Sequence, residues 1–211
     1  KVWVGLSKET AHQLGTPISS LMAWMDLLES SGVDPSLLSD MNKDVNRLSI
    51  IAERFSKIGS KPEMELIYVN EVLENATEYM RRRVSDKVLI TTHLPSDAEG
   101  AMVCLSLFEW VIENLCKNAV DAMNGEGRID VYMTSEKQQI YIDIKDTGKG
   151  IARKNFKTVF NPGYTTKKRG WGLGLTLAKR IIEDYHAGRI YVKDSEVGKG
   201  TTFRIELKRV V

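Results

Sequence analysis

The chain contains few cysteines and prolines and has almost no net charge. Its two cysteines, Cys104 and Cys116, lack metal-ligand spacing, which excludes a disulfide framework and a cysteine-rich metal site. We expect both to be buried thiols in a reducing compartment. The 30 Lys and Arg residues nearly balance the 28 Asp and Glu residues, giving a net charge of +2. This balance argues against nucleic-acid binding and against a general affinity for membrane surfaces.

Long apolar runs are also missing. No run approaches the roughly 20 residues that a membrane-spanning helix needs, so we expect no membrane contact in this fragment. Neither a Walker A motif nor a Gly-x-Gly-x-x-Gly following a strand is present. Their absence disfavours the P-loop and the dinucleotide-binding Rossmann folds. The chain has no initiator methionine and begins at Lys1 within a helical pattern. We therefore expect it to be part of a longer protein whose remaining segment lies upstream.

Residues 1–60 have the pattern of a helical hairpin. Apolar residues recur at alternating steps of three and four from about Val4 to Ser30 and from Asp34 to Ile58. Between these stretches, Ser31 to Pro35 contains a helix-ending glycine, an N-cap aspartate and a first-turn proline. Two such helices cannot enclose a core alone, so we expect two chains to form a dimeric four-helix bundle. The alternative is a single hairpin packed on the rest of its own chain.

Residues 61–211 mix helical and strand patterns after a boundary at Gly59 to Pro62. The order of these patterns predicts an α+β fold, with one sheet covered by helices on one face. The irregular, basic stretch between Ile151 and Gly170 is expected to be a functional lid. Helices are predicted at 69–83, 105–123 and about 171–186, and strands at 87–94, 128–133, 140–144, 188–193 and 201–208.

Six short motifs follow one another along the chain. A single glycine-rich loop is weak evidence for a ligand, because loops need glycine for many reasons. A metal-binding amide, a base-reading carboxylate and glycines that admit phosphates, in this order along the chain, together predict a nucleotide site. The motifs are His12 to Pro17, Asn114 to Asn118, Asp146 to Ile151, Val159 to Pro162, Gly170 to Leu175, and Gly198 to Thr201.

Over nearly the whole chain, these motifs resemble the H, N, first G, F, second G and third G boxes of the sensor histidine kinases of bacterial two-component systems. The resemblance implies that residues 1–60 form a dimerisation and histidine phosphoacceptor domain. It implies that residues 61–211 form a catalytic ATP-binding domain, an α/β sandwich of the histidine kinase, gyrase and heat-shock-chaperone ATPase superfamily. ATP and Mg²⁺ are the cofactors that it implies.

The resemblance also implies two protein partners. One is a second copy of the chain, bound through the helical hairpin to form a homodimer. The other is the receiver domain of a response regulator, expected to dock on the exposed face around His12, beside Met22 and Asp26. This fragment would then be a cytoplasmic portion, and the full-length protein is expected at the bacterial inner membrane.

His12 is the phosphoacceptor that the resemblance implies. It follows Ala11 of the apolar seam and should therefore point away from the bundle. An isolated exposed histidine is usually an ordinary surface residue, but the accompanying motifs favour a nucleophile. A neutral imidazole is available near pH 7, since its free pKa is about 6.5, and it can attack phosphorus to form a phosphoramidate. Pro17 should loosen the helix near this side chain.

Two departures from the family pattern, Gln13 and Asp121, keep an alternative function open. Asp121 stands where many family members carry a basic residue after the N box, which puts one phosphate contact in doubt. Gln13 stands where family members commonly carry an acid that orients the histidine ring, so we expect slow kinase activity. Thr16 matches the position that orients water when family members dephosphorylate their partner. The alternative is therefore a kinase-weak family member that acts mainly as a response-regulator phosphatase or docking module.

Asn118 is the Mg²⁺ ligand that the resemblance implies, because a neutral amide oxygen can complete a shell of phosphate oxygens and water. Asn114 lies one helical turn earlier on the same face, so both amides can point into one pocket. Related ATPases carry a water-activating glutamate at this position. Asn114 cannot act as a base, which favours phosphoryl transfer to a side chain over ATP hydrolysis.

The remaining nucleotide contacts are also implied by the resemblance. Asp146 would accept a hydrogen bond from the exocyclic amine of adenine, followed by Gly148 and Gly150 at the family spacing. An aspartate that caps its own turn is the ordinary alternative for Asp146. Thr201 would complete the adenine contacts. Backbone N–H groups are expected to face the triphosphate at Gly170, Gly172 and Gly174.

Overall fold

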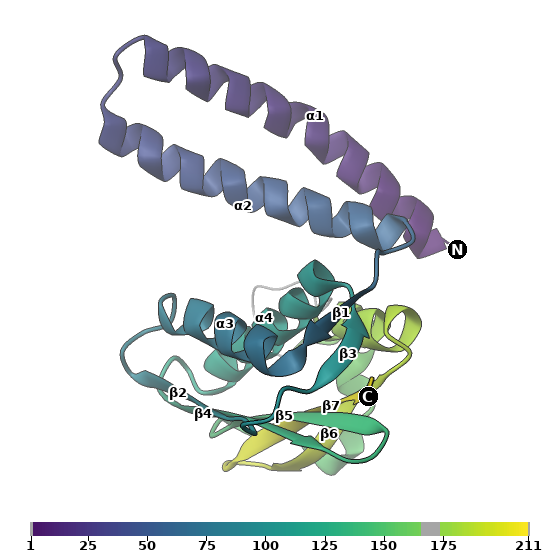
Figure 1. Ribbon diagram of the computed structural model, residues 1–211. Coiled ribbons are helices and arrows are strands. Elements are labelled where there is room, and N and C mark those ends of the chain that lie inside the picture. The colour runs from purple at the N-terminus through teal and green to yellow at the C-terminus, as the bar shows by residue number, and fades with distance from the viewer. Residues whose placement is uncertain (1, 166–173, 211) are drawn as a thin grey trace. The chain divides into compact units, whose positions relative to one another are not determined.

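The computed structural model describes residues 2–165 and 174–210, with side chains from residue 5 onward. It divides into two compact units, Lys1–Pro62 and Glu63–Val211. Figure 1 shows a helical hairpin in the first unit and a helix-covered sheet in the second, which confirms the predicted fold class. No helix within the described residues is both long and apolar enough to cross a membrane.

The hairpin consists of α1 (Val2–Ser30) and α2 (Pro35–Gly59). Gly32 adopts a φ of 77°, a left-handed conformation that favours glycine at the end of a helix. A carboxylate oxygen of Asp34 accepts a hydrogen bond from the backbone N–H of Ser36 at 2.9 Å, and Pro35 occupies the first turn of α2. The predicted cap, proline and glycine therefore form the turn.

Only half of the predicted apolar seam is buried within the hairpin. The fully buried contacts between the two helices recur at every seventh residue, and the half-buried Leu14 packs against them. A quarter of the seam stays exposed: Leu21, Met41 and Leu48 keep 42%, 45% and 44% of their surface, while Leu14, Leu28 and Phe55 are half-buried. The buried stripe thus holds the two helices of the hairpin together, and the exposed apolar residues remain on its surface. The buried stripe consists of Ala11, Ile18 and Met25 of α1 and Leu38, Val45 and Ala52 of α2.

The second unit is built on a five-stranded sheet in the order β2-β4-β5-β7-β6. Its neighbouring strands are antiparallel, except that β2 runs parallel to β4. The strands are β2 (Val88–His93), β4 (Gly127–Ser135), β5 (Gln139–Asp146), β6 (Arg189–Glu196) and β7 (Gly200–Lys208).

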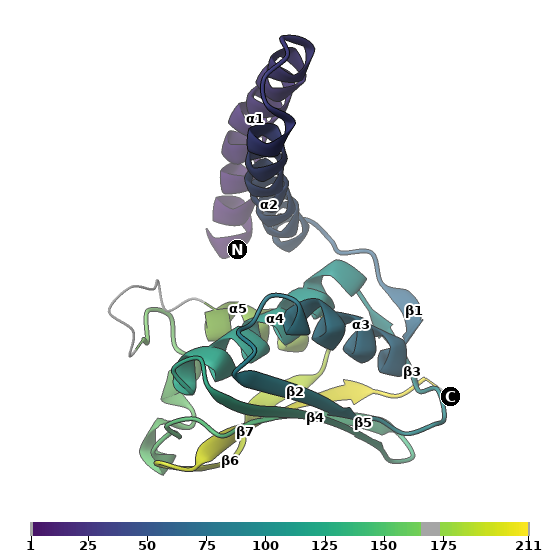
Figure 2. The same ribbon diagram turned by 90° about the vertical axis from the view of Figure 1, so that its left-hand side faces the viewer.

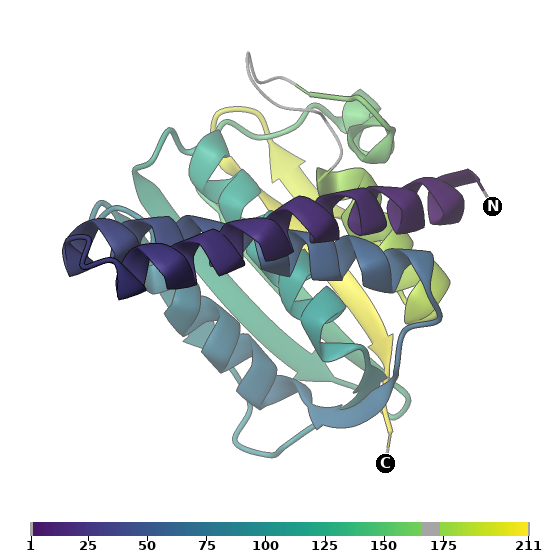
Figure 3. The same ribbon diagram turned by 90° about the horizontal axis from the view of Figure 1, so that it is seen from above.

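Three helices cover one face of this sheet: α3 (Val69–Arg81), α4 (Leu105–Ala122) and α5 (Gly174–Arg180) (Figure 2). From above, α3 and α4 lie side by side over the strands (Figure 3). The strand residues that face the helices are fully buried, as the alternation of apolar residues in β4 and β5 predicts. This core contains Ile129, Val131, Ile140, Ile142 and Ile144 of the sheet, and Leu107, Phe108, Val111, Ile112 and Leu115 of α4.

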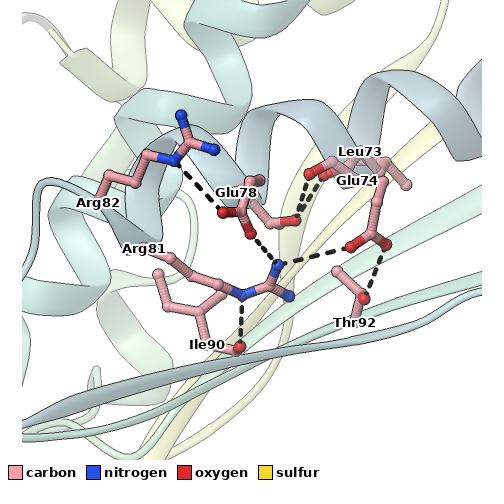
Figure 4. A network of polar contacts seen from close by, with 8 residues as sticks. Leu73, Glu74, Glu78, Arg81, Arg82, Ile90 and Thr92 are labelled. Atoms are coloured by element: carbon pink, nitrogen blue, oxygen red, sulfur yellow. Dashed lines mark hydrogen bonds and ion pairs between the residues drawn. The ribbon is translucent and has the colours of Figure 1, made fainter. Parts of the chain in front are cut away.

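A hydrogen-bond network joins α3 to the edge strand β2 (Figure 4). Arg81 donates from Nε to the carbonyl oxygen of Ile90 at 3.0 Å and from Nη1 to Glu78 at 3.0 Å. Thr92 donates from its hydroxyl to Glu74 at 3.0 Å. Because edge strands present unpaired carbonyls that invite further pairing, Arg81 protects this edge.

Two features differ from the sequence-based predictions. A small antiparallel sheet of β1 (Glu65–Tyr68) and β3 (Gly100–Val103) was not predicted, because four-residue strands are too short to show a clear alternation. The helix predicted at about 171–186 begins outside the described residues. Its described part is α5, which continues as a π-helical turn, η3 (Ile181–Tyr185).

Candidate functional site

Asp146 lies at the end of β5 with only 4% of its surface exposed. One carboxylate oxygen accepts the backbone N–H of Gly148 at 2.8 Å, and the backbone of Thr201 also donates to the carboxylate. Burial raises the pKa of Asp146, and these two hydrogen bonds oppose the rise. Asp146 therefore caps its own turn through Gly148 and also presents a buried carboxylate that can accept hydrogen bonds.

Gly148 and Gly150 let the loop after β5 pass between the end of α4 and the turn after β6. A Cβ atom on Gly148 would lie 2.7 Å from the carbonyl oxygen of Ala122. Gly150 has a φ of +74°, and a Cβ atom there would overlap the carbonyl oxygen of Glu196. Between the glycines, the N–H of Lys149 donates to Ala122 at 2.9 Å. These glycines therefore position Asp146 through close backbone packing within the chain.

Ser195 connects this loop to Thr201. Its Oγ accepts the N–H of Ile151 at 2.7 Å and donates to the carbonyl of Gly200 at 2.9 Å. Since that bond uses the proton of Ser195, the hydroxyl of Thr201 donates to Ser195 Oγ at 2.8 Å. Thr201 is buried and pairs in register with Asp146 across β5 and β7. Ser195 was not predicted, because a single serine in a strand carries no motif.

Asn114, in α4, lies beside the start of α5. Its Oδ1 is 4.0 Å from the position that a Cβ atom would take on Gly174. Its Nδ2 is buried and has no hydrogen-bond partner among the described residues. A buried donor without an acceptor costs about 1–3 kcal/mol, so this position favours a ligand or water oxygen next to the amide.

The F motif attaches the segment before α5 to the core. Val159 and Phe160 are buried. The Phe160 ring packs edge-on against the Phe203 ring, with ring centroids 6.1 Å apart. The hydroxyl of Thr176, in the first turn of α5, donates to the carbonyl of Phe160 at 2.9 Å. The predicted phosphate-binding residues Gly170 and Gly172 lie outside the described residues, so only Gly174 of that motif is placed.

The donor set of this site fits a divalent cation that is bound together with a nucleotide. Among residues 2–165 and 174–210, no three His, Cys, Asp or Glu side chains converge as a metal site. Asn118, one turn after Asn114 on α4, would contribute an amide oxygen. Mg²⁺ prefers oxygen ligands and usually keeps several waters and phosphate oxygens, so this donor set fits Mg²⁺ bound to a nucleotide.

The predicted phosphoacceptor motif lies in the first half of α1. His12, Gln13 and Thr16 are exposed, while Ala11 is buried against α2. The side-chain amide of Gln13 donates to Oε1 of Glu9 at 2.7 Å. Pro17 has no N–H, so it cannot donate to the carbonyl of Gln13 four residues earlier. The helix therefore lacks one backbone hydrogen bond next to His12. Glu9 lies outside the predicted motif and was not predicted, although its i, i+4 spacing to Gln13 is visible in the sequence.

Comparison with known proteins identifies the family of the second unit. Residues 105–211 match the family described as histidine kinase-, DNA gyrase B-, and HSP90-like ATPase. The chain is 30% identical over 209 residues to sporulation kinase E of Bacillus subtilis (strain 168), covering 96% of this chain and 28% of that protein. It is 26% identical to sporulation kinase A of the same organism, covering 97% of this chain and 34% of that protein. The chain thus spans about a third of the length of these relatives.

Solved structures show the same fold. Full-length ShkA in complex with AMPPNP has a TM-score of 0.75 and 19% identity, covering 98% of this chain and 46% of that chain. Histidine kinase ThkA in complex with response regulator protein TrrA has a TM-score of 0.63 and 19% identity, covering 98% of this chain and 61% of that chain. Together with the ordered motifs, these matches confirm the resemblance to bacterial two-component sensor histidine kinases, and the chain belongs to the histidine kinase-, DNA gyrase B-, and HSP90-like ATPase family.

Proposed function

We propose that this chain is an ATP-dependent protein-histidine kinase that autophosphorylates His12. Residues 1–60 act as the dimerisation and phosphoacceptor domain, and residues 61–211 as the catalytic domain. The phosphoryl group then passes to an aspartate of a response regulator. ATP and Mg²⁺ are bound by Asn114, Asn118, Asp146, Gly148, Gly150, Gly170, Gly172, Gly174 and Thr201, with Asn118 on the metal.

The unpaired amide of Asn114 is the observation that carries this proposal. It lies buried beside Gly174, where a phosphate oxygen would satisfy its free N–H. A carboxamide cannot take a proton from water, so the site lacks the base that ATP hydrolysis would need at this position. Phosphoryl transfer depends mainly on positioning and charge stabilisation, and a neutral imidazole needs no base to attack. An exposed histidine as acceptor fits such a site.

The hairpin surface supports a homodimer. The exposed stripe of Leu21, Met41 and Leu48 continues the apolar seam of both helices, and a second copy would bury it in a four-helix bundle. Such a stripe is costly to leave in water. In this proposal, the phosphoryl group reaches His12 of the same chain or of its partner.

The response regulator binds the α1 face that carries His12. His12, Met22 and Asp26 are exposed along this helix, so a receiver domain can approach the imidazole directly. The ThkA structure, a complex with its response regulator, supports a partner of this kind. We further propose that the chain functions in the cytoplasm, as a portion of a protein located at the bacterial inner membrane.

The test is to incubate the purified chain with γ-labelled ATP and Mg²⁺, beside His12→Ala and Asp146→Asn. Label that is stable to alkali and lost in acid marks phosphohistidine, and we expect it on the parent alone. His12→Ala should still bind ATP. Release of free phosphate without labelled protein would instead indicate an ATPase.

The second candidate is a response-regulator phosphatase or docking module with weak kinase activity. Gln13 supports it, because its amide is bonded to Glu9 and cannot accept a proton from His12. Thr16, exposed one turn after His12, would orient the attacking water. A parent chain that binds ATP without becoming labelled, yet dephosphorylates a phosphorylated receiver domain, would establish this candidate.

A further inference from the structure

A carboxylate, that of Glu9, lies about one helical turn before the proposed phosphoacceptor His12 in α1. Glu9 is three residues before His12 and four before Gln13, and these spacings bring side chains together on a helix surface. The side-chain amide of Gln13 donates to Oε1 of Glu9 at 2.7 Å. Only the NH₂ group of an amide can donate to a carboxylate, so this contact fixes which way the Gln13 amide points.

Helix geometry places His12 on the same surface of α1 as Glu9. Side chains of a helix lean towards its N-terminus, over the residues three and four positions earlier. For His12 these residues are Glu9 and Lys8. Gln13 donates its hydrogen bond to Oε1 of Glu9, so the other carboxylate oxygen, Oε2, is the one that could accept a hydrogen bond from the His12 ring.

We propose that Glu9 is the positioning carboxylate of His12, and that Gln13 holds it in place. This inference rests on the proposed kinase function. Oε2 of Glu9 accepts the hydrogen bond from Nδ1–H of His12, which keeps the lone pair on Nε2. Nε2 forms a bond to the γ-phosphorus of ATP, and the bond from that phosphorus to the bridging oxygen breaks, with its electron pair leaving on ADP. The proton on Nδ1 passes to Glu9 and then to solvent.

Gln13 alone cannot perform this role. A carboxamide is not a proton acceptor, so the residue after the histidine cannot take the ring proton in this chain. In this chain the carboxylate belongs to Glu9, one helical turn before Gln13, and Gln13 donates a hydrogen bond to it. The pair is exposed, so replacing either member should leave the helix folded.

The experiment compares Glu9→Gln with the double variant Glu9→Gln/Gln13→Glu. General-base help is typically worth 10²–10⁴-fold, and exposure to water reduces it, so we expect Glu9→Gln to slow phosphohistidine formation about 10- to 100-fold with ATP binding unchanged. The double variant returns the carboxylate to the residue after His12 and should recover most of the rate. Glu29→Gln, another exposed glutamate of α1, is the matched control and should keep the parent rate.

A second measurement needs no nucleotide. The chain has three histidines, so ¹⁵N NMR with His12→Ala identifies the ring signals of His12. We expect its Nδ1–H tautomer to dominate in the parent and in the double variant, and to decrease in Glu9→Gln. A merely structural role of Glu9 would leave the tautomers unchanged.

The outcomes separate this inference from the kinase proposal. A parent that forms no phosphohistidine overturns both. A parent that is labelled, with Glu9→Gln labelled at the same rate or with the same tautomers, overturns the role of Glu9 alone. Slow labelling of Glu9→Gln without recovery in the double variant also overturns it, because any carboxylate beside the ring should then have sufficed.

Discussion

The backbone N–H of Cys104 donates a hydrogen bond to Nε2 of His186 at 3.1 Å, joining residues 82 apart in the sequence. The other ring nitrogen, Nδ1, donates to the carbonyl oxygen of Ile181 at 2.8 Å. Both bonds can form only in a neutral ring that carries its proton on Nδ1. His186 therefore ties the start of α4 to the end of the π-helical turn η3, at the core of the second unit.

The first prediction concerns the pH dependence of stability. Burial lowers the pKa of His186 from the ordinary value of 6.5, and the bond to Ile181 opposes this shift. The unfolded chain therefore binds a proton more readily, so the stabilising contribution is complete above about pH 6.5 and is lost as the pH falls through the lowered pKa. Melting temperatures at pH 7.5, 6.5 and 5.5 should fall more steeply for the parent than for His186→Gln. Parallel curves would contradict this role, since His12 and His93 are common to both proteins.

The second prediction concerns the packing of α1 on α2. A Cβ atom on Gly59 would lie 2.8 Å from Cβ and 2.9 Å from Cα and N of Lys8, so Gly59→Ala must push the helices apart. We expect a loss of about 1–3 kcal/mol in the free energy of unfolding of the hairpin, as for other overpacked sites. Gly15→Ala is the control, because its Cβ position has no atom within 4 Å apart from its chain neighbours and the backbone of its own helix. That change should instead stabilise α1 by about 0.5–1 kcal/mol. Urea unfolding followed by circular dichroism measures both, and equal effects would contradict the close contact.

The third prediction separates the functional role of Asp146 from its effect on stability. A hydrogen bond to a charged acceptor contributes about 1.5–3 kcal/mol, so Asp146→Asn should weaken ATP binding at least about tenfold. Burial raises the pKa of Asp146, so the folded chain destabilises the ionised carboxylate, and this cost persists at pH 7. The variant should therefore be at least as stable as the parent in the absence of nucleotide.

Calorimetric titration with ATP and thermal melting at pH 7 measure the two effects of Asp146→Asn. Asp194→Asn, an exposed aspartate of β6, should change neither quantity. Unchanged ATP affinity in Asp146→Asn would contradict adenine recognition by this carboxylate.

The fourth prediction concerns a buried ion pair near the C-terminal end of the described chain. Nε of Arg209 lies 2.6 Å from Oε2 of Glu99, whose side chain is only 7% exposed, although Nε itself makes no hydrogen bond. Ser135 donates to the other oxygen at 2.8 Å. Glu99→Gln leaves the Arg209 guanidinium without a counter-charge and should cost about 2–3 kcal/mol.

A surface ion pair serves as the control for Glu99. Lys199 lies 2.9 Å from Glu196, with side chains 73% and 67% exposed, so Glu196→Gln should cost less than about 0.5 kcal/mol. Urea unfolding of both variants measures the difference. A small loss in Glu99→Gln would mean that water already screens the Arg209 pair.

The fifth prediction concerns thiol reactivity. Burial, followed by the nearby charge of Glu113, raises the pKa of Cys116 to about 12. The thiolate is the reactive form, so Cys116 should not react with a disulfide reagent at pH 8 in the folded chain. Cys104 is also buried. Both thiols should react once urea unfolds the protein, and a thiol that reacts rapidly before unfolding would contradict the described core.

Much of the fold could be predicted because it is encoded locally. The alternating steps of three and four identify the hairpin, and the Gly32 and Asp34 signals give its turn to within a residue. Period-two alternation identifies β4 and β5 as neighbours. The pairing of Glu65–Tyr68 with Gly100–Val103 could not be predicted, since such short strands are stable only when tertiary contacts bring them together.

The candidate site likewise contains residues that could be predicted from the sequence and residues that only tertiary contacts reveal. The family resemblance named Asp146 and Thr201 for one site, and the structure pairs these two residues across β5 and β7. Ser195 was missed, since its contact with Ile151 spans 44 residues and exists only when β6 and β7 lie beside the loop. The contact between Cys104 and His186 was missed for the same reason.

By itself, the sequence determined the hairpin, the main helices and strands of the second unit, and that His12 faces away from the apolar seam. Only the tertiary structure decided that part of the hairpin seam stays exposed, that Asp146 is buried, and that the amide of Asn114 has no acceptor among residues 2–165 and 174–210. The physical reason is that periodicity and turn chemistry act between residues close in the chain. Burial and hydrogen-bond satisfaction depend instead on which distant segments pack together.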